Sequence, residues 1–194
     1  MSGFRWHGRG VPGTVRVMIQ PLPLSEHRLS TPIGEVVLLT DATGALRALD
    51  FADYDARMRR LLDRHYGVAG WSIAPAAATG AAVDAVTAYF AGDLTAIDSL
   101  PTVTGGTTFQ RAVWAALRRV KAGDTVSYGD IAAMIDRPSA VRAVGMANGA
   151  NPVAIVVPCH RIIGRSGALT GYAGGVERKR WLLAHERRDG LFGG

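Results

Sequence analysis

The sequence predicts an α/β protein in which a small N-terminal α/β domain precedes a mainly helical C-terminal domain. Two hydrophobic runs separated by a turn indicate a β-hairpin in residues 30–51, whereas apolar residues at helical spacing dominate the second half of the chain. Pro101 and the pair Gly105-Gly106 lie between the two patterns and mark a boundary. With 194 residues, 48% of them hydrophobic, the chain can form two small cores. We therefore expect domains at residues 21–104 and 105–194.

The N-terminal half shows strand and helix patterns in alternation. Residues 1–20 are rich in Gly and Arg without a sustained period, so we expect a flexible leader there. Asp41-Ala42-Thr43-Gly44 is a turn sequence between two strands. Helices are predicted at Ala52–Tyr66 and Ala81–Ala91, and an extended linker is expected over residues 93–107.

The C-terminal half begins with three helical patterns. Apolar residues from Phe109 to Val120 recur at helical spacing and predict the first helix. Ser127 is a suitable cap for a short helix, and a turn at residues 136–139 leads to another helix at Ala140–Ala150, so the two outline a helix-turn-helix. The last of these helices is mostly Ala and Gly, which indicates either a surface that a ligand approaches closely or tight packing against another helix.

The segment around the only cysteine, Cys159, is predicted to be a buried strand followed by a glycine-rich loop. Ala154–Val157 is a short apolar run typical of a buried strand, which Pro158 ends. Residues 161–175 hold five glycines, so we expect a wing-like hairpin or a loop that exposes bare backbone to a ligand. An amphipathic helix at Val176–Glu186 follows.

The basic charge is confined to the C-terminal half. Residues 105–194 hold 13 Lys and Arg against 6 Asp and Glu, while residues 1–104 hold 9 against 10. A basic half of this kind attracts a polyanion such as DNA, or it is a solvated surface that maintains solubility. Both interpretations stay open from the charge alone.

Composition excludes several classes of protein. One cysteine rules out an internal disulfide framework and a cysteine-rich zinc site. The chain contains no apolar run of the roughly 18 to 20 residues that a membrane-spanning helix needs, and its start lacks a signal-peptide pattern. We therefore expect a soluble, cytoplasmic protein without membrane contact.

Cys159 is either inert packing, which is the commoner role of a free cysteine, or a nucleophile. A thiol reacts as the thiolate, which requires a base or positive surroundings, and His160 and Arg161 adjoin it. On an extended strand His160 would point to the opposite face and would act through a bridging water. A histidine base needs a partner that fixes its tautomer, and Glu186 and Asp130 are both candidates.

The segment Ile155-Val-Val-Pro-Cys-His-Arg-Ile-Ile-Gly164 resembles the active-site sequence of the O6-alkylguanine-DNA alkyltransferases. The resemblance covers the whole C-terminal half and, with less specific motifs, the N-terminal half. It implies an N-terminal ribonuclease H-like sheet with helices and a C-terminal winged helix-turn-helix domain. The other matching segments are residues 109–114, 126–129, 142–145, 148–152, 171–175 and 180–186, with the weaker Thr31-Pro-Ile-Gly34 and Tyr89-Phe-Ala-Gly-Asp-Leu94.

The resemblance implies an irreversible transfer of an alkyl group to Cys159 from O6 of guanine, and also from O4 of thymine. His160 would deprotonate the thiol through a water, Glu186 would orient the histidine, and Asn151 would hold the turn beneath the active-site segment. No cofactor is implied. No metal is expected either, because the zinc site of some relatives uses cysteine in the N-terminal domain, where this chain has none. Each molecule would act once, since a thioether has no reducing route back.

The resemblance further implies that the damaged base is flipped out of the duplex before it reacts. Arg142 would fill the gap that the base leaves, and Tyr128 would crowd the 3′ phosphate. The helix that starts at Ala140 would enter the minor groove of alkylated double-stranded DNA, bound by a monomer that clusters on DNA. The base pocket would comprise Tyr128, Leu169, Gly171, Tyr172, Ala173 and Gly174, and the DNA contacts would comprise Arg142, Tyr128, Ser127, Ala140, Gly145 and Asn148.

Three alternatives stay open. A non-enzymatic sensor of alkyl lesions is a branch of the same family in which the cysteine is replaced, so Cys159 argues against it. A winged-helix transcription regulator would explain the basic half but not Pro158-Cys-His-Arg161 beside a glycine-rich loop. A cysteine hydrolase is disfavoured because no oxyanion-hole arrangement is recognisable.

Overall fold

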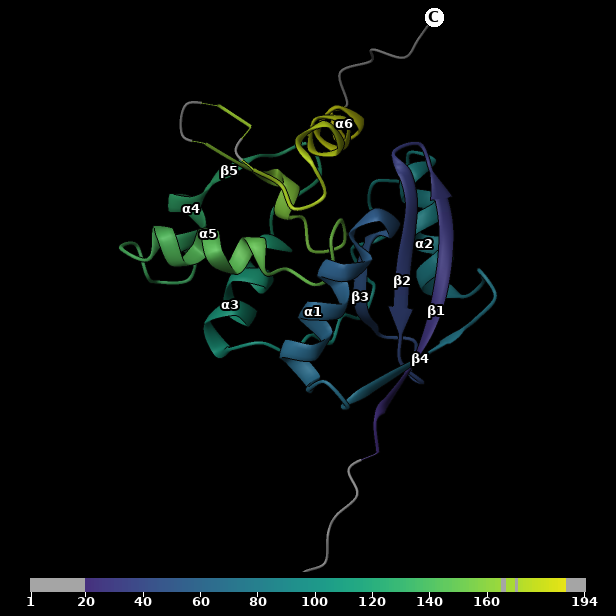
Figure 1. Cartoon of the computed structure of the whole chain (residues 1–194). Coiled ribbons are helices and arrows are strands. Elements are labelled where there is room, and N and C mark those ends of the chain that lie inside the picture. The colour runs from purple at the N-terminus through teal and green to yellow at the C-terminus, as the bar shows by residue number, and fades with distance from the viewer. Residues whose placement is uncertain (1–19, 165–166, 170, 188–194) are drawn as a thin grey trace, which may run out of the picture.

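The computed structural model describes residues 20–164, 167–169 and 171–187 (Figure 1). The leader expected over residues 1–20 lies outside this range, except for Gln20. A sheet with two helices forms the N-terminal half, and helices with two very short strands form the C-terminal half. The predicted fold class is therefore confirmed. Within the described residues, none of the helices is long and apolar enough to cross a membrane.

The N-terminal sheet has four strands in the order β3-β2-β1-β4. The predicted hairpin is confirmed, since β2 and β3 pair antiparallel around a turn that begins at Asp41. The strands β1 and β4 were not predicted from the sequence, because β1 mixes polar with apolar residues and every residue of β4 is exposed or half-buried. The strands span Leu22–Thr31 (β1), Gly34–Thr40 (β2), Leu46–Phe51 (β3) and Trp71–Pro75 (β4), with β1 antiparallel to β2 and parallel to β4.

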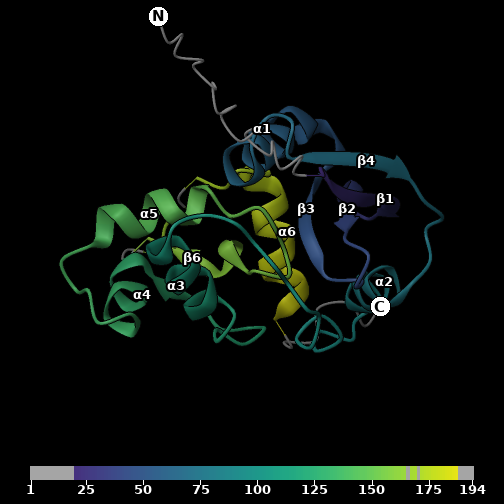
Figure 2. The ribbon, with the colours of Figure 1, turned by 90° about the horizontal axis from the view of Figure 1, so that it is seen from below.

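Two helices cover opposite faces of this sheet (Figure 2). Successive side chains of a strand alternate between faces, and along β2 Val36 and Leu38 belong to one apolar cluster while Val37 and Leu39 belong to the other. The first cluster includes residues of α2, and the second includes residues of α1. The four successive residues of β2 are all buried for this reason. The 3-10 turn Ala52–Tyr54 (η1) and α1 (Asp55–Tyr66) agree with the first predicted helix, and α2 (Ala81–Phe90) agrees with the second.

The extended linker expected over residues 93–107 is wrong in its first part. Residues 94–99 form consecutive turns, and Ile97 and Leu100 are buried in the core. Apolar side chains explain the difference, because an extended path would have left both of them in water. Only from Pro101 onward does the chain extend, with Thr102 bridging to Leu46 beside β3.

The C-terminal half contains the predicted helix-turn-helix. Thr107 caps the helix that precedes this motif, in a capping box with Gln110. Ser127 caps the first helix of the motif in the same way, with Asp130. The helix α6 lies between the sheet and the other three helices of this half (Figure 2). The elements span Thr108–Leu117 (α3), Val126–Ser127 (β5), Tyr128–Met134 (α4), Val141–Gly149 (α5), Ile162–Ile163 (β6) and Val176–Glu186 (α6), with β5 parallel to β6.

The prediction of a strand at Ala154–Val157 is wrong, although the prediction that these residues are buried is confirmed. These residues form a turn, because the backbone of Ala154 donates a hydrogen bond to Leu49 of β3 and that of Val157 donates back to Val153. In the glycine-rich region the backbone of Gly164 donates a hydrogen bond to Ala168, and that of Gly167 donates to Gly164. From there to α6 the described residues form a loop without strands.

Candidate active site

Cys159 lies at the start of a 3-10 turn, Cys159–Arg161 (η2), and its side chain is only 4% exposed. The expectation that Cys159 and His160 follow each other on extended backbone is therefore wrong. The preceding turn contains a strained residue, since Ile155 has φ +69°, a value that a β-branched side chain rarely adopts. Backbone strain of this kind persists only where neighbouring contacts determine the conformation.

Asn151 provides contacts that determine this turn. Its Oδ1 accepts a hydrogen bond from the Val153 backbone at 3.0 Å, and its Nδ2 donates to the Val157 carbonyl at 2.8 Å. The same Nδ2 lies 3.1 Å from Cys159 Sγ, so the amide donates to the sulfur. Asn151 thus links the end of α5 to the cysteine, and its amide favours negative charge on the sulfur.

His160 belongs to a fully buried polar network. Its Nε2 lies 2.9 Å from Glu186 Oε1, and the same oxygen accepts a hydrogen bond from the Tyr89 hydroxyl at 2.7 Å. Arg161 donates to both carboxylate oxygens of Glu186, each at 2.8 Å. Of the two candidate partners of His160, the structure selects Glu186, because Asp130 instead caps α4. His160 Nδ1 is buried and has no hydrogen-bond partner among the described residues.

The electrostatics of the network set the protonation state of each member. Burial lowers the pKa of His160, although Glu186 partly offsets this, so the imidazole is neutral near pH 7. Burial opposes the ionisation of Glu186, but hydrogen bonds from His160 and Arg161 outweigh it and hold the pKa of this carboxyl well below its usual range. Burial also raises the pKa of the Cys159 thiol, despite the Asn151 amide. The resting site therefore holds a neutral thiol and a neutral base.

Lys179 of α6 is a buried cation that was not predicted from the sequence. Its side chain is fully buried, and its Nζ donates to the Ile162 carbonyl at 2.5 Å. Its charge favours the thiolate form of Cys159, while burial lowers the pKa of Lys179 itself. A lysine in an amphipathic helix pattern usually points to solvent, so nothing in the local sequence separates it from the exposed Arg180.

Arg57 of α1 connects the N-terminal half to the active-site turn. It pairs with the buried carboxylate of Asp50, and its guanidinium donates to the carbonyls of Gly149 at 2.8 Å and Asn151 at 3.0 Å. The local sequence carries no signal for this contact, since the partners are separated by more than 90 residues. The N-terminal domain thus supports the C-terminal end of α5, and with it the backbone that positions Asn151.

The predicted base-pocket residues lie in the loop before α6 and at the start of α4. Tyr172 presents its ring edge to His160, with 6.4 Å between centroids, and its hydroxyl is buried without a hydrogen-bond partner among the described residues. Gly174 is packed so closely that an added Cβ would lie 2.7 Å from the ring of Phe51. For the others, whose pocket role stays a prediction, the structure shows Tyr128, Leu169 and Ala173 half-buried and Gly171 exposed.

The predicted DNA-contact residues lie on and around α5. Arg142 is exposed on this helix. A Cβ added at Gly145 would lie 3.7 Å from the ring of Tyr128. Asn148 is only 7% exposed, so its side chain does not lie on the exposed face. Ala140 and Ser127 occupy the N-cap positions of α5 and α4. These DNA contacts stay predictions.

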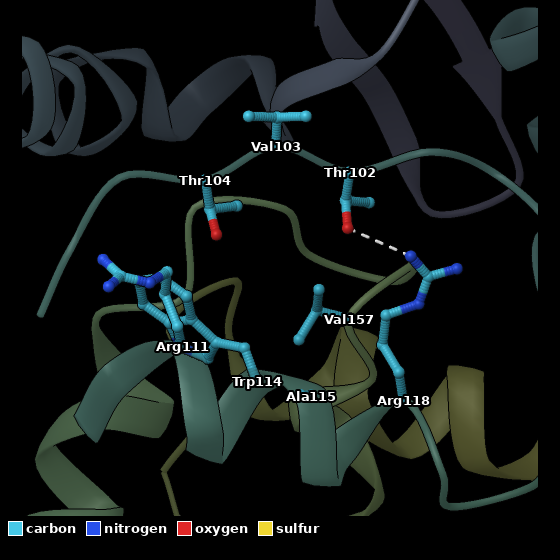
Figure 3. Close-up of a pocket in the computed structure, with 8 residues that line it drawn as sticks. All are labelled: Thr102, Val103, Thr104, Arg111, Trp114, Ala115, Arg118 and Val157. Carbon is cyan, nitrogen blue, oxygen red and sulfur yellow. Dashed lines mark hydrogen bonds between the residues drawn. The ribbon is translucent and has the colours of Figure 1, made fainter. Parts of the chain in front are cut away.

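A separate cavity of about 330 Å³ lies between the linker and α3 (Figure 3). Thr102, Val103 and Thr104 form its linker side, and Trp114 and Arg118 belong to α3 and its C-cap on the other side. Arg118 holds the linker by donating to Thr102 Oγ1 and to the carbonyls of residues 98 and 100. The cavity reaches the active-site segment only at the side chain of residue 157.

No group of three or more His, Cys, Asp or Glu side chains that could hold a metal ion is found in the part of the chain that the structure describes. Around Cys159, Asn151 instead donates to the sulfur, and Glu186 pairs with His160 Nε2 and with Arg161. The arrangement combines a nucleophile, a neutral base and a fixed counter-charge in one buried site. It is therefore suited to transfer a group to sulfur.

Comparison with known proteins agrees with this arrangement. Residues 25–104 match the family description "6-O-methylguanine DNA methyltransferase, ribonuclease-like domain", and residues 108–188 match "6-O-methylguanine DNA methyltransferase, DNA binding domain". A methylated-DNA--protein-cysteine methyltransferase of Shigella flexneri is 51% identical over 165 residues, which cover 85% of this chain and 96% of the relative. The solved structure of Mycobacterium tuberculosis OGT in complex with DNA is similar with a TM-score of 0.70 and 42% identity, over 84% of this chain and 92% of that one. The chain belongs to the 6-O-methylguanine DNA methyltransferase family.

Proposed function

We propose that this protein repairs DNA by moving the alkyl group of O6-alkylguanine, and of O4-alkylthymine, onto Cys159 in one irreversible step. The observation that carries the proposal is the buried sulfur of Cys159, which lies 3.1 Å from the Asn151 amide. The next residue, His160, is held at its Nε2 by Glu186. Residues 105–194 would bind DNA and carry the cysteine, and residues 21–104 would support them. The protein would act in the cytoplasm as a monomer.

The chemistry is a displacement at carbon. The bond between O6 and the alkyl carbon breaks while a bond between that carbon and Sγ forms, and the thiol proton is finally left on the restored base. His160 Nδ1, buried and unpaired among the described residues, is the atom available to accept that proton first, through a water. Glu186 then stabilises the imidazolium. No electron transfer occurs, so the step needs no cofactor.

Access to the base requires it to leave the duplex, because O6 of a stacked guanine cannot reach a sulfur that is 4% exposed. We propose that α5 enters the minor groove, where its small residues allow a close approach. Arg142, exposed on this helix, would fill the gap in the stack. The flipped base would lie against Tyr172 and the loop that leads to Gly174.

The direct test is the intact mass of the protein after incubation with a duplex that contains one O6-methylguanine. We expect a gain of one CH2 group per molecule and no further gain with excess DNA. Tight binding of the lesion without a gain in mass would favour the lesion-sensor alternative. Binding of unmodified and methylated duplexes alike, again without a gain, would favour a DNA-binding regulator.

The transfer rate is expected to fall in acid at a lower pH than an ordinary histidine base would give. Because burial lowers the pKa of His160 from its usual 6.5, the base remains neutral at pH 6.5 and is lost only at lower pH. Because burial raises the pKa of Cys159 above 9.0, the free thiolate contributes only at alkaline pH. The second-order rate constant, measured from pH 5 to 8.5, should therefore fall to half of its plateau value only below pH 6.5. A half-maximal rate at pH 6.5 would show that His160 titrates normally.

Replacing Arg142 with alanine is expected to slow transfer by roughly 10- to 100-fold, because an unstacked base without a replacement costs a few kcal/mol. The affinity for the same duplex should change much less. Single-turnover transfer rates at saturating DNA, compared with the dissociation constant from fluorescence anisotropy, separate the two effects. Equal losses in rate and affinity would mean that Arg142 only contacts a phosphate.

A further inference from the structure

A groove of about 380 Å³ runs between α1 and the C-terminal end of α5. Three arginines of α1 line one side, namely Arg57, Arg60 and Arg64, and the α5 side includes Met146 and Gly149. Residues three, four and seven apart lie on one face of a helix, so the three arginines form a single basic row. Figures 1 and 2 both place α1 beside the end of α5.

Two of these arginines carry charge that the fold does not use. Arg57 is occupied by Asp50 and by two backbone carbonyls. Arg60 and Arg64 are exposed, and neither forms an ion pair or a side-chain hydrogen bond within the described part of the chain. Their neighbour Arg59 differs, because it pairs with Asp55 at 2.7 Å.

The groove continues the exposed face of α5. Arg142, Met146 and Gly149 are the exposed residues at helical spacing on that helix, and they run for about 10 Å along its axis toward the groove. Met146 is 71% exposed, so its side chain leaves this face of α5 open to a ligand. A DNA strand that follows this face beyond Arg142 arrives at Arg60 and Arg64.

We propose that Arg60 and Arg64 bind backbone phosphates of the duplex that α5 holds, so that the N-terminal domain extends the DNA-binding surface. The inference rests on the proposed function in that α5 is the helix that meets DNA. Charge complementarity selects the ligand, since two unpaired guanidinium groups in a row fit successive phosphates of one strand. The net charge of the N-terminal half gives no sign of this basic row, because Lys and Arg are balanced there by Asp and Glu.

The test is the salt dependence of binding to an unmodified duplex of about 20 base pairs, with and without the double substitution Arg60→Ala/Arg64→Ala. Each phosphate contact contributes about 0.9 to the slope of log affinity against log salt, so the slope should flatten by about 2. At low salt the affinity should fall by roughly 10- to 100-fold. Arg60→Lys/Arg64→Lys keeps both charges and should retain most of the slope.

The matched control is Arg28→Ala/Arg59→Ala, which removes the same net charge from arginines that already pair with Glu26, Glu35 and Asp55. Its slope should stay within about 0.5 of the wild-type value. An unchanged slope in the Arg60/Arg64 variant, or equal flattening in both double variants, overturns the inference. Because this readout uses unmodified DNA, it is independent of alkyl transfer. A wild-type protein that takes up no methyl group contradicts the proposed function alone.

Discussion

A Cys159→Ser variant is expected to take up no methyl group from O6-methylguanine DNA, a loss of roughly 10⁴-fold or more in the transfer rate. Serine is close to cysteine in size, but its hydroxyl is a far weaker nucleophile than a thiolate near neutral pH. The geometry leaves no substitute, because Cys159 is the only cysteine of the chain. The measurement is the intact mass after incubation, together with the methyl content of the recovered duplex.

The Cys159→Ser variant should still fold and bind the damaged duplex, since the Asn151 amide can donate to a hydroxyl as it does to the sulfur. Thermal unfolding and anisotropy serve as controls for fold and binding. Asn151→Ala, by contrast, should weaken both fold and transfer, because it releases the turn that contains the strained Ile155. Methyl uptake by Cys159→Ser would place the acceptor elsewhere and contradict the proposed mechanism.

A Glu186→Gln variant is expected to lose about 3 to 5 kcal/mol of folding free energy, because it leaves a buried arginine without its counter-charge. Arg161 is 3% exposed, and Glu186 is the only carboxylate with which it pairs in the described part of the chain. Gln keeps the shape of Glu, so the loss reports charge and not volume. Urea unfolding at pH 7 gives the difference directly.

The pH dependence of that difference provides a second readout. The folded protein holds the pKa of Glu186 below its usual 4.5, so its contribution to stability is complete above pH 4.5 and decreases as the pH falls below that value. The gap between wild type and variant should therefore narrow in acid. Glu177→Gln is the matched control on the same helix, since its side chain is 84% exposed and should cost less than about 0.5 kcal/mol. Equal losses in the two variants would show that the Glu186 pair is not a stabilising one.

The active site is a product of both halves of the chain. Tyr89 of α2 donates to Glu186, and Arg57 of α1 supports the carbonyls at the end of α5. Burial raises the pKa of Tyr89 far above its usual range, so this hydroxyl remains a donor. The N-terminal domain therefore does more than accompany the DNA-binding domain: it completes the hydrogen bonds of the reactive centre.

The elements that could be predicted from the sequence are those whose signals are local. The turn beginning at Asp41, the cap at Ser127 and the contiguous segment around Cys159 each depend on neighbours within a few residues. The same is true of the helical spacing in α2 and α3. For such elements the hydrophobic period and the capping chemistry are sufficient.

What only the tertiary structure decided is set by contacts between distant residues. Ala154–Val157 has the composition of a strand, yet it turns because Leu49 and Asn151 take up its backbone groups. Asp130 and Glu186 were equal candidates by residue type, and the position of α6 selects Glu186. Hydrogen bonds and ion pairs act over about 3 Å, so a pairing between residues far apart in the chain exists only once the fold has closed that distance.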